Sequence, residues 1–512
     1  SAASDVYKRQ IMDTIEGINQ RRDCSDFYLV GLLGMVCRFG DDPGFPEDIR
    51  QPLKDCILNF KYWYDEPGSD VMWYWSENHQ ILFHACEILA GQLYPDLTFT
   101  NNGQTGGWHR EHGERMALAW MRDRGTHGFS EWDSNCYFEE DLLALSHLAD
   151  LAETDAVWEM ASIMIDKILF SIALNSYKGV FGSTHGRTYA PQIKGGYLEG
   201  TSGIANLVWG MGVFNNRILG TVSMACMQNY ELPVMLQRIA VDLPEELWSR
   251  EHHAPVDPFR ETGDGVDKVT YKTPDAMLCS AQDYRPGEPG RQQHIWQATL
   301  GPGATVFVNH PSCASEDGSR RPNFWSGNLV LPRVAQWKDV LIGVYRLPDD
   351  DWMGFTHAYF PVHAFDETTI RDNWAFARKG NGYLALTASQ PLTLIKTGHM
   401  AYRELRAPGL HTVWLCHMGR AVLDGDFAAF QEKILTRDVA FDDLSVRAVT
   451  LCGDTLTFGW GGPFRRNGEE VPLHGFKHYE SPYCVADFPA EQMDIQFGGV
   501  TMRLKFTEKE EA

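Results

Sequence analysis

Several features are missing from this chain of 512 residues, and each absence excludes a class of protein. No apolar run approaches the eighteen or so residues that a membrane-spanning helix needs. Basic residues are scarce, with 45 Lys and Arg against 68 Asp and Glu and a formal net charge of −23, and they form no cluster suited to phosphates. We therefore expect neither a membrane span nor a nucleic-acid partner. An acidic substrate would need a locally basic cleft.

The eleven cysteines contain no CxxC pair, and no group of Cys and His has the spacing of a zinc site. We expect mostly buried thiols with one or two disulfides, and no cofactor or catalytic metal; a structural divalent cation stays open. No internal repeat is visible. The opening ten residues, SAASDVYKRQ, resemble translated sequencing-adapter sequence, and we set them aside as non-native.

The first half of the chain has the three- and four-residue apolar spacing of helices, separated by short loops. The predicted helices cover 27–38, 48–60, 77–93, 111–124, 138–153, 156–175, 202–209 and 223–236. Consecutive helical hairpins without strands between them favour an (α/α) toroid, here at 26–243 after an N-terminal segment 1–25. The loops between paired helices would converge on one mouth.

The second half changes character after a Pro-, Glu- and His-rich linker at 244–264. The predicted strands cover 268–272, 294–300, 305–309, 340–346, 382–387, 412–417, 446–451 and 502–506. We expect an antiparallel β-sandwich over 265–512. The fold class is therefore α+β with two large domains.

The first candidate site is an aromatic loop that leads into a helix at 73–80, WYWSENHQ. Glu77, Asn78 and His79 are consecutive polar residues where the apolar pattern begins, and Trp75 precedes them. A solvated helix start is the alternative interpretation. In a toroid this position faces the mouth.

Two further loops of the helical half combine titratable and aromatic side chains. One, at 124–141, contains His127, Glu131, Trp132, Asp133 and Tyr137. The other, at 181–200, contains His185, Arg187, Tyr189, Lys194 and Tyr197. Flat aromatic rings are common platforms for sugar rings, and long polar loops are commonly functional, although turn chemistry alone would also explain such compositions.

A basic and aromatic loop in the second half, 320–333, includes Arg321 and Trp325. We predict that this loop contacts the mouth of the helical domain. His357 and His363 flank a nearby strand-like segment, but they lack the spacing of metal ligands.

These residue types suit β-elimination of a 4-linked uronate. Removal of the C5 proton requires that the adjacent carboxylate be neutralised by donors such as Asn or Arg, and that a base and an acid lie within reach. A cationic neighbourhood would lower the pKa of a tyrosine toward a usable range. The residues that could fill these roles are Asn78, His79, Tyr137, His185, Arg187 and Tyr189.

The expected order of domains resembles the polysaccharide lyases of the alginate, chondroitin and heparinase type. Asn78 and His79 are similar to the Asn-His pair in the cleft of those enzymes, and 128–148 resembles the segment that carries their catalytic tyrosine. The resemblance implies that Asn78 and Arg187 hold the uronate carboxylate while His79 and Tyr137 exchange the proton. It also implies an acidic polysaccharide or oligosaccharide as substrate and a secreted, periplasmic or cell-surface location.

Three alternatives stay open. Asp133 and Asn135 stand where the alginate type has an arginine, so His185 with Tyr189 or Tyr197 could instead be the proton-transfer pair. A glycoside hydrolase on the same helical ring could use two of the carboxylates Glu77, Glu131, Asp133 and Asp141. A glycan-binding protein without catalysis is the third interpretation.

Overall fold

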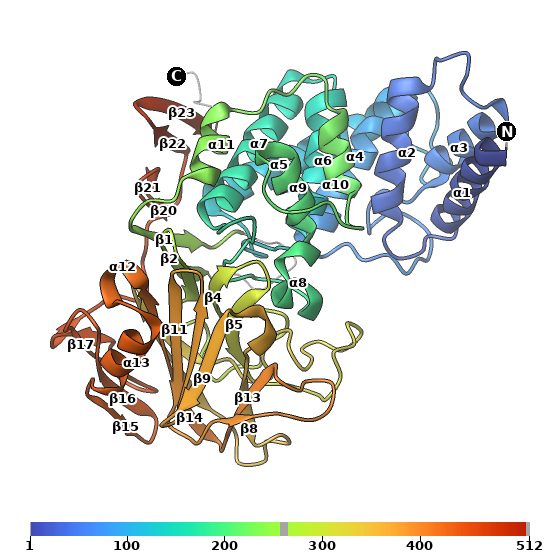
Figure 1. Cartoon of the computed structure of the whole chain (residues 1–512). Helices are drawn as coiled ribbons and strands as arrows, with labels where there is room; N and C mark the ends of the chain where they lie inside the picture. Colours follow the sequence, from blue (N-terminus) through green and yellow to red (C-terminus); the bar gives the residue numbers. More distant parts are fainter. Residues whose placement is uncertain (1, 257–264, 508–512) are drawn as a thin grey trace.

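The computed structural model describes residues 2–256 and 265–507, and it confirms a mixed α+β fold (Figure 1). A helical part, residues 2–241, precedes a strand part, residues 247–507. Residues 257–264 of the expected linker lie outside the described residues. Strand β1 (Leu247–His253) lies inside the segment that we expected to be a linker. Its side chains alternate between buried and partly buried, as in a strand with one face on the core, and it pairs antiparallel with β2 (Val266–Lys272).

The helical part contains eleven α-helices among the described residues. They are α1 (Ala2–Asn19), α2 (Ser25–Phe39), α3 (Glu47–Asn59), α4 (Glu77–Leu93), α5 (Gly106–His127), α6 (Phe138–Leu151), α7 (Asp155–Leu174), α8 (Ala190–Lys194), α9 (Gly200–Trp209), α10 (Leu219–Cys226) and α11 (Val234–Val241). Helix α4 packs against α2, α5 and α6 and is buried on all its sides up to Gly91. Helix α4 is therefore the central helix of this part. His79, in its first turn, lines the cleft that is described below.

Most predicted helices are confirmed, with ends that shift by a few residues. The helix predicted at 223–236 is wrong, because the chain forms α10 and α11 with a non-helical segment, 227–233, between them. Pro233 has no N–H, so it suits the N-cap of α11 and would remove a backbone hydrogen bond from a continuous helix. The apolar spacing continued across this break and concealed it.

The strand part consists of antiparallel sheets with two further α-helices, α12 (Ala421–Asp424) and α13 (Phe427–Leu435). Its first fourteen strands are β1, β2, β3 (Met277–Ala281), β4 (Trp296–Gly301), β5 (Ala304–Asn309), β6 (Arg333–Trp337), β7 (Val340–Arg346), β8 (Phe355–Tyr359), β9 (Glu367–Arg371), β10 (Trp374–Lys379), β11 (Gly382–Ala388), β12 (Thr393–Leu394), β13 (Glu404–Pro408) and β14 (His411–Arg420). The remaining strands are β15 (Val439–Asp442), β16 (Ser445–Val449), β17 (Thr455–Gly459), β18 (Arg465–Arg466), β19 (Glu469–Glu470), β20 (Tyr479–Glu480), β21 (Val485–Ala486), β22 (Gln492–Phe497) and β23 (Val500–Lys505).

Two large sheets share one apolar core. Their strand orders are β12-β13-β8-β5-β4-β3-β2-β1-β20-β21 and β6-β7-β14-β11-β10-β9. Trp296 of the first sheet and Trp414 of the second are both fully buried in this core. Strands such as β4 and β5 are buried along their whole length, which explains why they appear as continuous apolar runs in the sequence.

The end of the chain returns to the helical part. Strands β22 and β23 lie beside α11 and α7 (Figure 1), and Met493, Leu504 and Phe506 belong to the helical part's apolar core. Tyr479 of β20 pairs its hydroxyl with Ser171 Oγ of α7 at 2.8 Å. The helical part is therefore completed by strands from the C-terminal end of the described chain.

A buried ionic network also joins the two parts. Lys268 of β2 donates to Asp133, in the loop before α6, and to Glu251 of β1 at 2.9 Å, and no side chain of the three is more than 1% exposed. Burial alone would raise the pKa of Glu251, but Lys268 and His253 lower it to about 2, whereas burial raises that of Asp133 to about 6. One lysine thus compensates two buried acids and fixes the loop that holds Glu131 and Tyr137.

Among the described residues, no helix is long and apolar enough to cross a membrane. All eleven cysteines are free thiols, most of them buried, so the one or two expected disulfides are not formed. Cys226 and Cys452 are the exposed ones.

Candidate functional site

A cleft of about 1420 Å³ lies between the loops of the helical part and those of the strand part. Side chains from both parts line it. They include Asp23, Cys24, Phe27, Trp73, Trp75, His79, Glu131, Trp132, Tyr137, Arg187, Tyr189, His253, Tyr284, Arg285, Arg291, Gln292, Ser319 and Arg321. The three sequence motifs of the helical part and the loop 320–333 therefore meet at one place.

His79 lies in the first turn of α4 and is supported from behind by a buried carboxylate. Its Nδ1 is 2.8 Å from Oδ2 of Asp26, which lies in the first turn of α2 and is fully buried. The imidazole stacks on Phe27 with ring centroids 4.8 Å apart. Burial raises the pKa of Asp26, and His79 opposes that shift. When Asp26 is ionised, it fixes the proton on Nδ1 and leaves the lone pair of Nε2 for the cleft.

Two tyrosines and two arginines form a second cluster in the cleft. The hydroxyls of Tyr137 and Tyr189 are 2.7 Å apart. Arg187 donates to both of them, at 3.3 and 3.4 Å, and its guanidinium lies 4.5 Å from the ring centroid of Tyr137. Arg321, from the strand part, donates to the Tyr189 hydroxyl at 2.9 Å. Two guanidinium groups thus donate to the Tyr189 hydroxyl, which also shares a hydrogen bond with the Tyr137 hydroxyl.

The electrostatics of Tyr137 differ from the sequence-based expectation. We expected nearby cations to lower the pKa of a catalytic tyrosine. Burial instead raises the pKa of Tyr137 far above its ordinary value, although Arg187 acts in the opposite direction. The Tyr137 hydroxyl therefore stays protonated at neutral pH, so it can act as a proton donor but not as a base.

The loops that carry this cluster are held together by backbone and side-chain bonds. The Gly186 N–H donates to the Trp132 carbonyl at 2.8 Å, and a Cβ on Gly186 would lie within 3 Å of the backbone of residues 130–132. Ser134 Oγ donates to the Arg187 carbonyl at 2.8 Å. Glycine permits this close approach, which brings Arg187 next to Tyr137.

Glu77 is a structural clamp beside the cleft. It is 1% exposed and accepts hydrogen bonds from the backbone N–H groups of Ser130 and Glu131, each at 2.7 Å, and from Arg124 Nε at 3.0 Å. Because both carboxylate oxygens are engaged, Glu77 fixes the start of the neighbouring loop.

Of the four carboxylates considered for a hydrolase, Glu131 is the one that lines the cleft, and it pairs with Arg187 at 3.1 Å. Asp133 is fully buried against Lys268. Asp141 is 2% exposed, and burial together with Glu77 and Glu131 raises its pKa far above the ordinary value.

The cleft is basic within an acidic chain. Arg187, Arg285, Arg291 and Arg321 line it, against the carboxylates of Asp23 and Glu131. This composition is the one that an acidic substrate would require.

Several predicted site residues lie outside the cleft lining. Asn78 is buried and accepts a hydrogen bond from Ser76 Oγ at 2.7 Å. His185 is fully buried, with Nδ1 bonded to the Asp133 carbonyl and its ring stacked on His294, and burial lowers its pKa far below the ordinary value. Neither side chain is positioned to contact a ligand in the cleft without rearrangement.

Of the remaining predicted residues, two line the cleft and the others lie outside its lining. Trp75 and Trp132 line the cleft, and the Trp132 indole N–H donates to Thr184 at 2.8 Å. Trp325 is fully buried, and its ring stacks on that of His357 with centroids 3.9 Å apart. The Nδ1 atom of His127 lies 2.8 Å from Oδ1 of Asp123. Tyr197 is 52% exposed and does not line the cleft. The predicted contact of the loop 320–333 with the helical part is confirmed by the bond between Arg321 and Tyr189.

Sequence reasoning missed the support residues near α2 and two arginines. Asp23, Cys24 and Asp26 precede or begin an apolar helix in the polar run RRDCSD, and that run was the available signal. Arg285 and Arg291 lie in a loop of the strand part that carries no motif.

Comparison with known proteins adds no family to this picture. No protein-family model matches the chain, and no curated protein sequence matches it either.

Proposed function

We propose that this protein is a polysaccharide lyase that cleaves a uronate-containing glycan by β-elimination. In this proposal the helical part is an (α/α) toroid and the strand part is an antiparallel β-sandwich. The observation that carries the proposal is the convergence in one basic cleft of a carboxylate-supported histidine, His79, with the hydroxyl and guanidinium groups of Tyr137, Tyr189 and Arg187.

Each step of the elimination has a candidate group. Arg187 and Arg321 neutralise the uronate carboxylate and so acidify the C5 proton. His79 Nε2 accepts that proton while Asp26 stabilises the imidazolium. The electron pair forms the C4–C5 double bond, the C4–O bond breaks, and Tyr137 donates its proton to the departing oxygen. The products are an unsaturated uronate and a new reducing end.

This assignment differs in one respect from the roles that the resemblance implies. Asn78 is buried beside Ser76, so Arg321 rather than Asn78 joins Arg187 as the carboxylate ligand. The positions of the acids favour elimination over hydrolysis, since Glu131 would have to leave its pairing with Arg187 to serve as a general acid. Appearance of the unsaturated uronate, followed by its ultraviolet absorbance, tests the reaction.

Replacing Tyr137 with phenylalanine is expected to lower kcat about 10²- to 10⁴-fold, because the proton donor to the leaving group is removed. KM should change little, since Arg187 and Arg321 remain. Initial rates of double-bond formation measure the effect. Tyr197→Phe, which changes an exposed hydroxyl outside the cleft lining, is the matched control and should retain its rate. A Tyr137→Phe enzyme with a near-normal kcat would remove Tyr137 from the mechanism.

Replacing Arg321 with glutamine is expected to raise KM about tenfold, because one charge-assisted hydrogen bond to the substrate carboxylate is lost. Arg320→Gln removes the same charge from the adjacent, exposed residue outside the cleft lining and serves as the control. Equal KM increases in the two variants would indicate a general charge effect and not a specific contact.

A further inference from the structure

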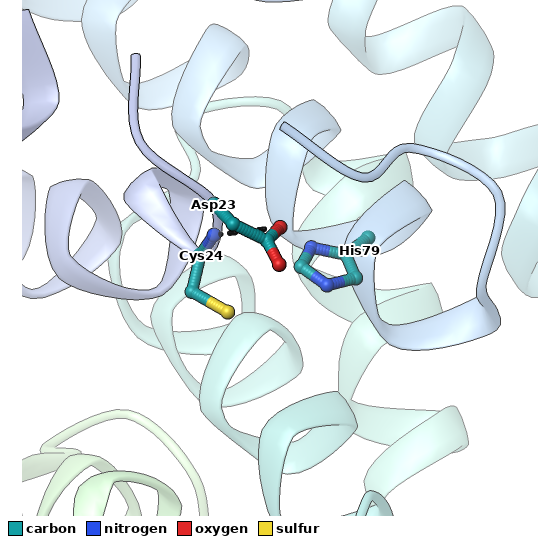
Figure 2. A group of neighbouring side chains, drawn as sticks. All are labelled: Asp23, Cys24 and His79. Carbon is teal, nitrogen blue, oxygen red and sulfur yellow. Dashed lines mark hydrogen bonds between the residues drawn. The ribbon is translucent and has the colours of Figure 1, made fainter. Parts of the chain in front are cut away.

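A group of three potential metal ligands lines the cleft and includes the proposed base, His79. Asp23, Cys24 and His79 each offer one ligand atom, and these atoms lie within 4.8 Å of one another. Figure 2 shows the Asp23 carboxylate pointing toward the His79 ring, with Cys24 next to it. All three residues line the cleft, so an ion could enter from solvent.

Hydrogen bonds hold two of the three side chains, Asp23 and His79, in the absence of an ion. Asp23 Oδ1 accepts hydrogen bonds from the backbone N–H groups of Cys24 at 3.1 Å and Trp73 at 3.2 Å, and its Oδ2 is left for a ligand. Cys24 has a left-handed backbone, with φ 65°, just before α2. This sharp turn places its thiol on the same side as the carboxylate (Figure 2).

Asp26 orients the His79 ring in a way that favours metal binding. Metal-binding histidines commonly donate their other ring nitrogen to a carboxylate, which fixes the tautomer and orients the ring. Asp26 holds Nδ1 of His79 in this way at 2.8 Å, and Nε2 is then the ring nitrogen that is available as a ligand.

Three acids, Asp23, Asp26 and Glu140, act electrostatically on the Cys24 thiol, against one cation, Arg187. A divalent ion would offset part of this negative charge, and coordination would release the thiol proton to solvent.

We propose that Asp23, Cys24 and His79 bind a divalent transition-metal ion of the zinc class, with the remaining coordination position open to the cleft. One carboxylate, one thiolate and one imidazole form a donor set that suits Zn²⁺ and Co²⁺ better than Mg²⁺ or Ca²⁺. The bound ion occupies His79 Nε2, the atom that accepts the C5 proton. The metal therefore inhibits elimination; this consequence rests on the proposed function, whereas metal binding does not.

The binding test uses the purified full chain, freed of metal with a chelator and titrated with Co²⁺. A thiolate bound to Co²⁺ gives a charge-transfer band in the near ultraviolet, and we expect this band to saturate at one equivalent. Cys24→Ser should abolish the band. It should also raise the Kd for Co²⁺ by more than the 10- to 100-fold that is typical when a residue hydrogen-bonded to a metal ligand is lost. Cys24→His should keep Co²⁺ binding but lose the band.

Cys226→Ser is the matched control, because Cys226 is an exposed free thiol. It should leave the band and the Kd for Co²⁺ unchanged. Circular dichroism of each variant checks that the fold is retained. A wild-type protein without the band, or a band that persists in Cys24→Ser, would overturn the site.

The activity test compares the rate of double-bond formation with and without Zn²⁺, each variant being measured against its own metal-free rate. We expect Zn²⁺ to inhibit the wild type and Cys226→Ser strongly, and Cys24→Ser and Asp23→Asn at least tenfold less. Equal inhibition of all four proteins would refute the inhibitory role. If Co²⁺ binds through Cys24 but no substrate is cleaved, the metal site stands and the proposed function fails.

Discussion

Replacement of His79 with alanine is expected to reduce kcat about 10²- to 10⁴-fold, because the group that accepts the C5 proton is lost. The fold should survive with reduced stability, because His79 is 7% exposed and its loss leaves the buried Asp26 carboxylate without this hydrogen-bond partner. Chemical denaturation of the variant separates this loss from the change in kcat. Rates of unsaturated-uronate formation at saturating substrate measure the effect.

His411→Ala is the control for this substitution. His411 is a partly exposed histidine at the start of β14, bonded to Asp443 at 2.9 Å and outside the cleft lining, so its loss should leave kcat unchanged. If His79→Ala retained wild-type kcat, the base would have to be another group, and Tyr189, which accepts hydrogen bonds from Arg187 and Arg321, would be the next candidate.

Replacing Lys268 with methionine is expected to lower the free energy of unfolding by about 3–5 kcal/mol, because it leaves two buried carboxylates without their cation. Asp133 would then keep the hydrogen bond from Ser183, and Glu251 its contacts with Asn175 and His253, but neither would have the lysine charge. Chemical denaturation at pH 8 measures the loss, and activity should fall with it because Asp133 belongs to the loop that holds Tyr137.

The pH dependence of this loss has a definite sign. Because the pKa of Asp133 is already raised to about 6 in the presence of Lys268, removal of the cation raises it further. The carboxyl groups become protonated as pH falls, so the deficit of Lys268→Met should be smaller at pH 5 than at pH 8. Lys505→Met, on an exposed position of β23, is the control and should be nearly neutral at both pH values. A pH-independent deficit would contradict the buried-charge explanation.

The sequence identified the cleft but could not say which side of each motif faces it. Asn78 and His79 are neighbours on α4, and successive residues on a helix point about 100° apart. One therefore contacts the cleft and the other the interior. In the same way, Arg187 and Tyr189 line the cleft while His185 is buried by its pairing with His294.

Partners that are distant in sequence were beyond prediction. Asp26 supports His79 across 53 positions, and Arg321 reaches Tyr189 across 132. The burial that raises the pKa of Tyr137 also depends on how the loops pack, and this packing is not visible in residue types alone. Glu77, by contrast, was recognised as a polar residue at a helix start, but its role as a clamp on backbone amides follows from the fold.

Local patterns predicted elements more reliably than connections between them. The start and end of α4 and β7 were predicted correctly, since both segments combine a clear periodicity with flanking loop residues. The return of β22 and β23 to the core of the helical part was not anticipated, because short alternating strands carry no information about what they pack against.

The most direct test of the central claim is to incubate the protein with a panel of uronate-containing polysaccharides and oligosaccharides. Absorbance in the ultraviolet band of unsaturated uronates is followed alongside the release of reducing ends. A parallel rise in both signals is the result expected for β-elimination in the cleft of His79, Tyr137 and Arg187. Release of reducing ends without the absorbance would mean hydrolysis, would contradict the proposal, and would direct attention to Glu131.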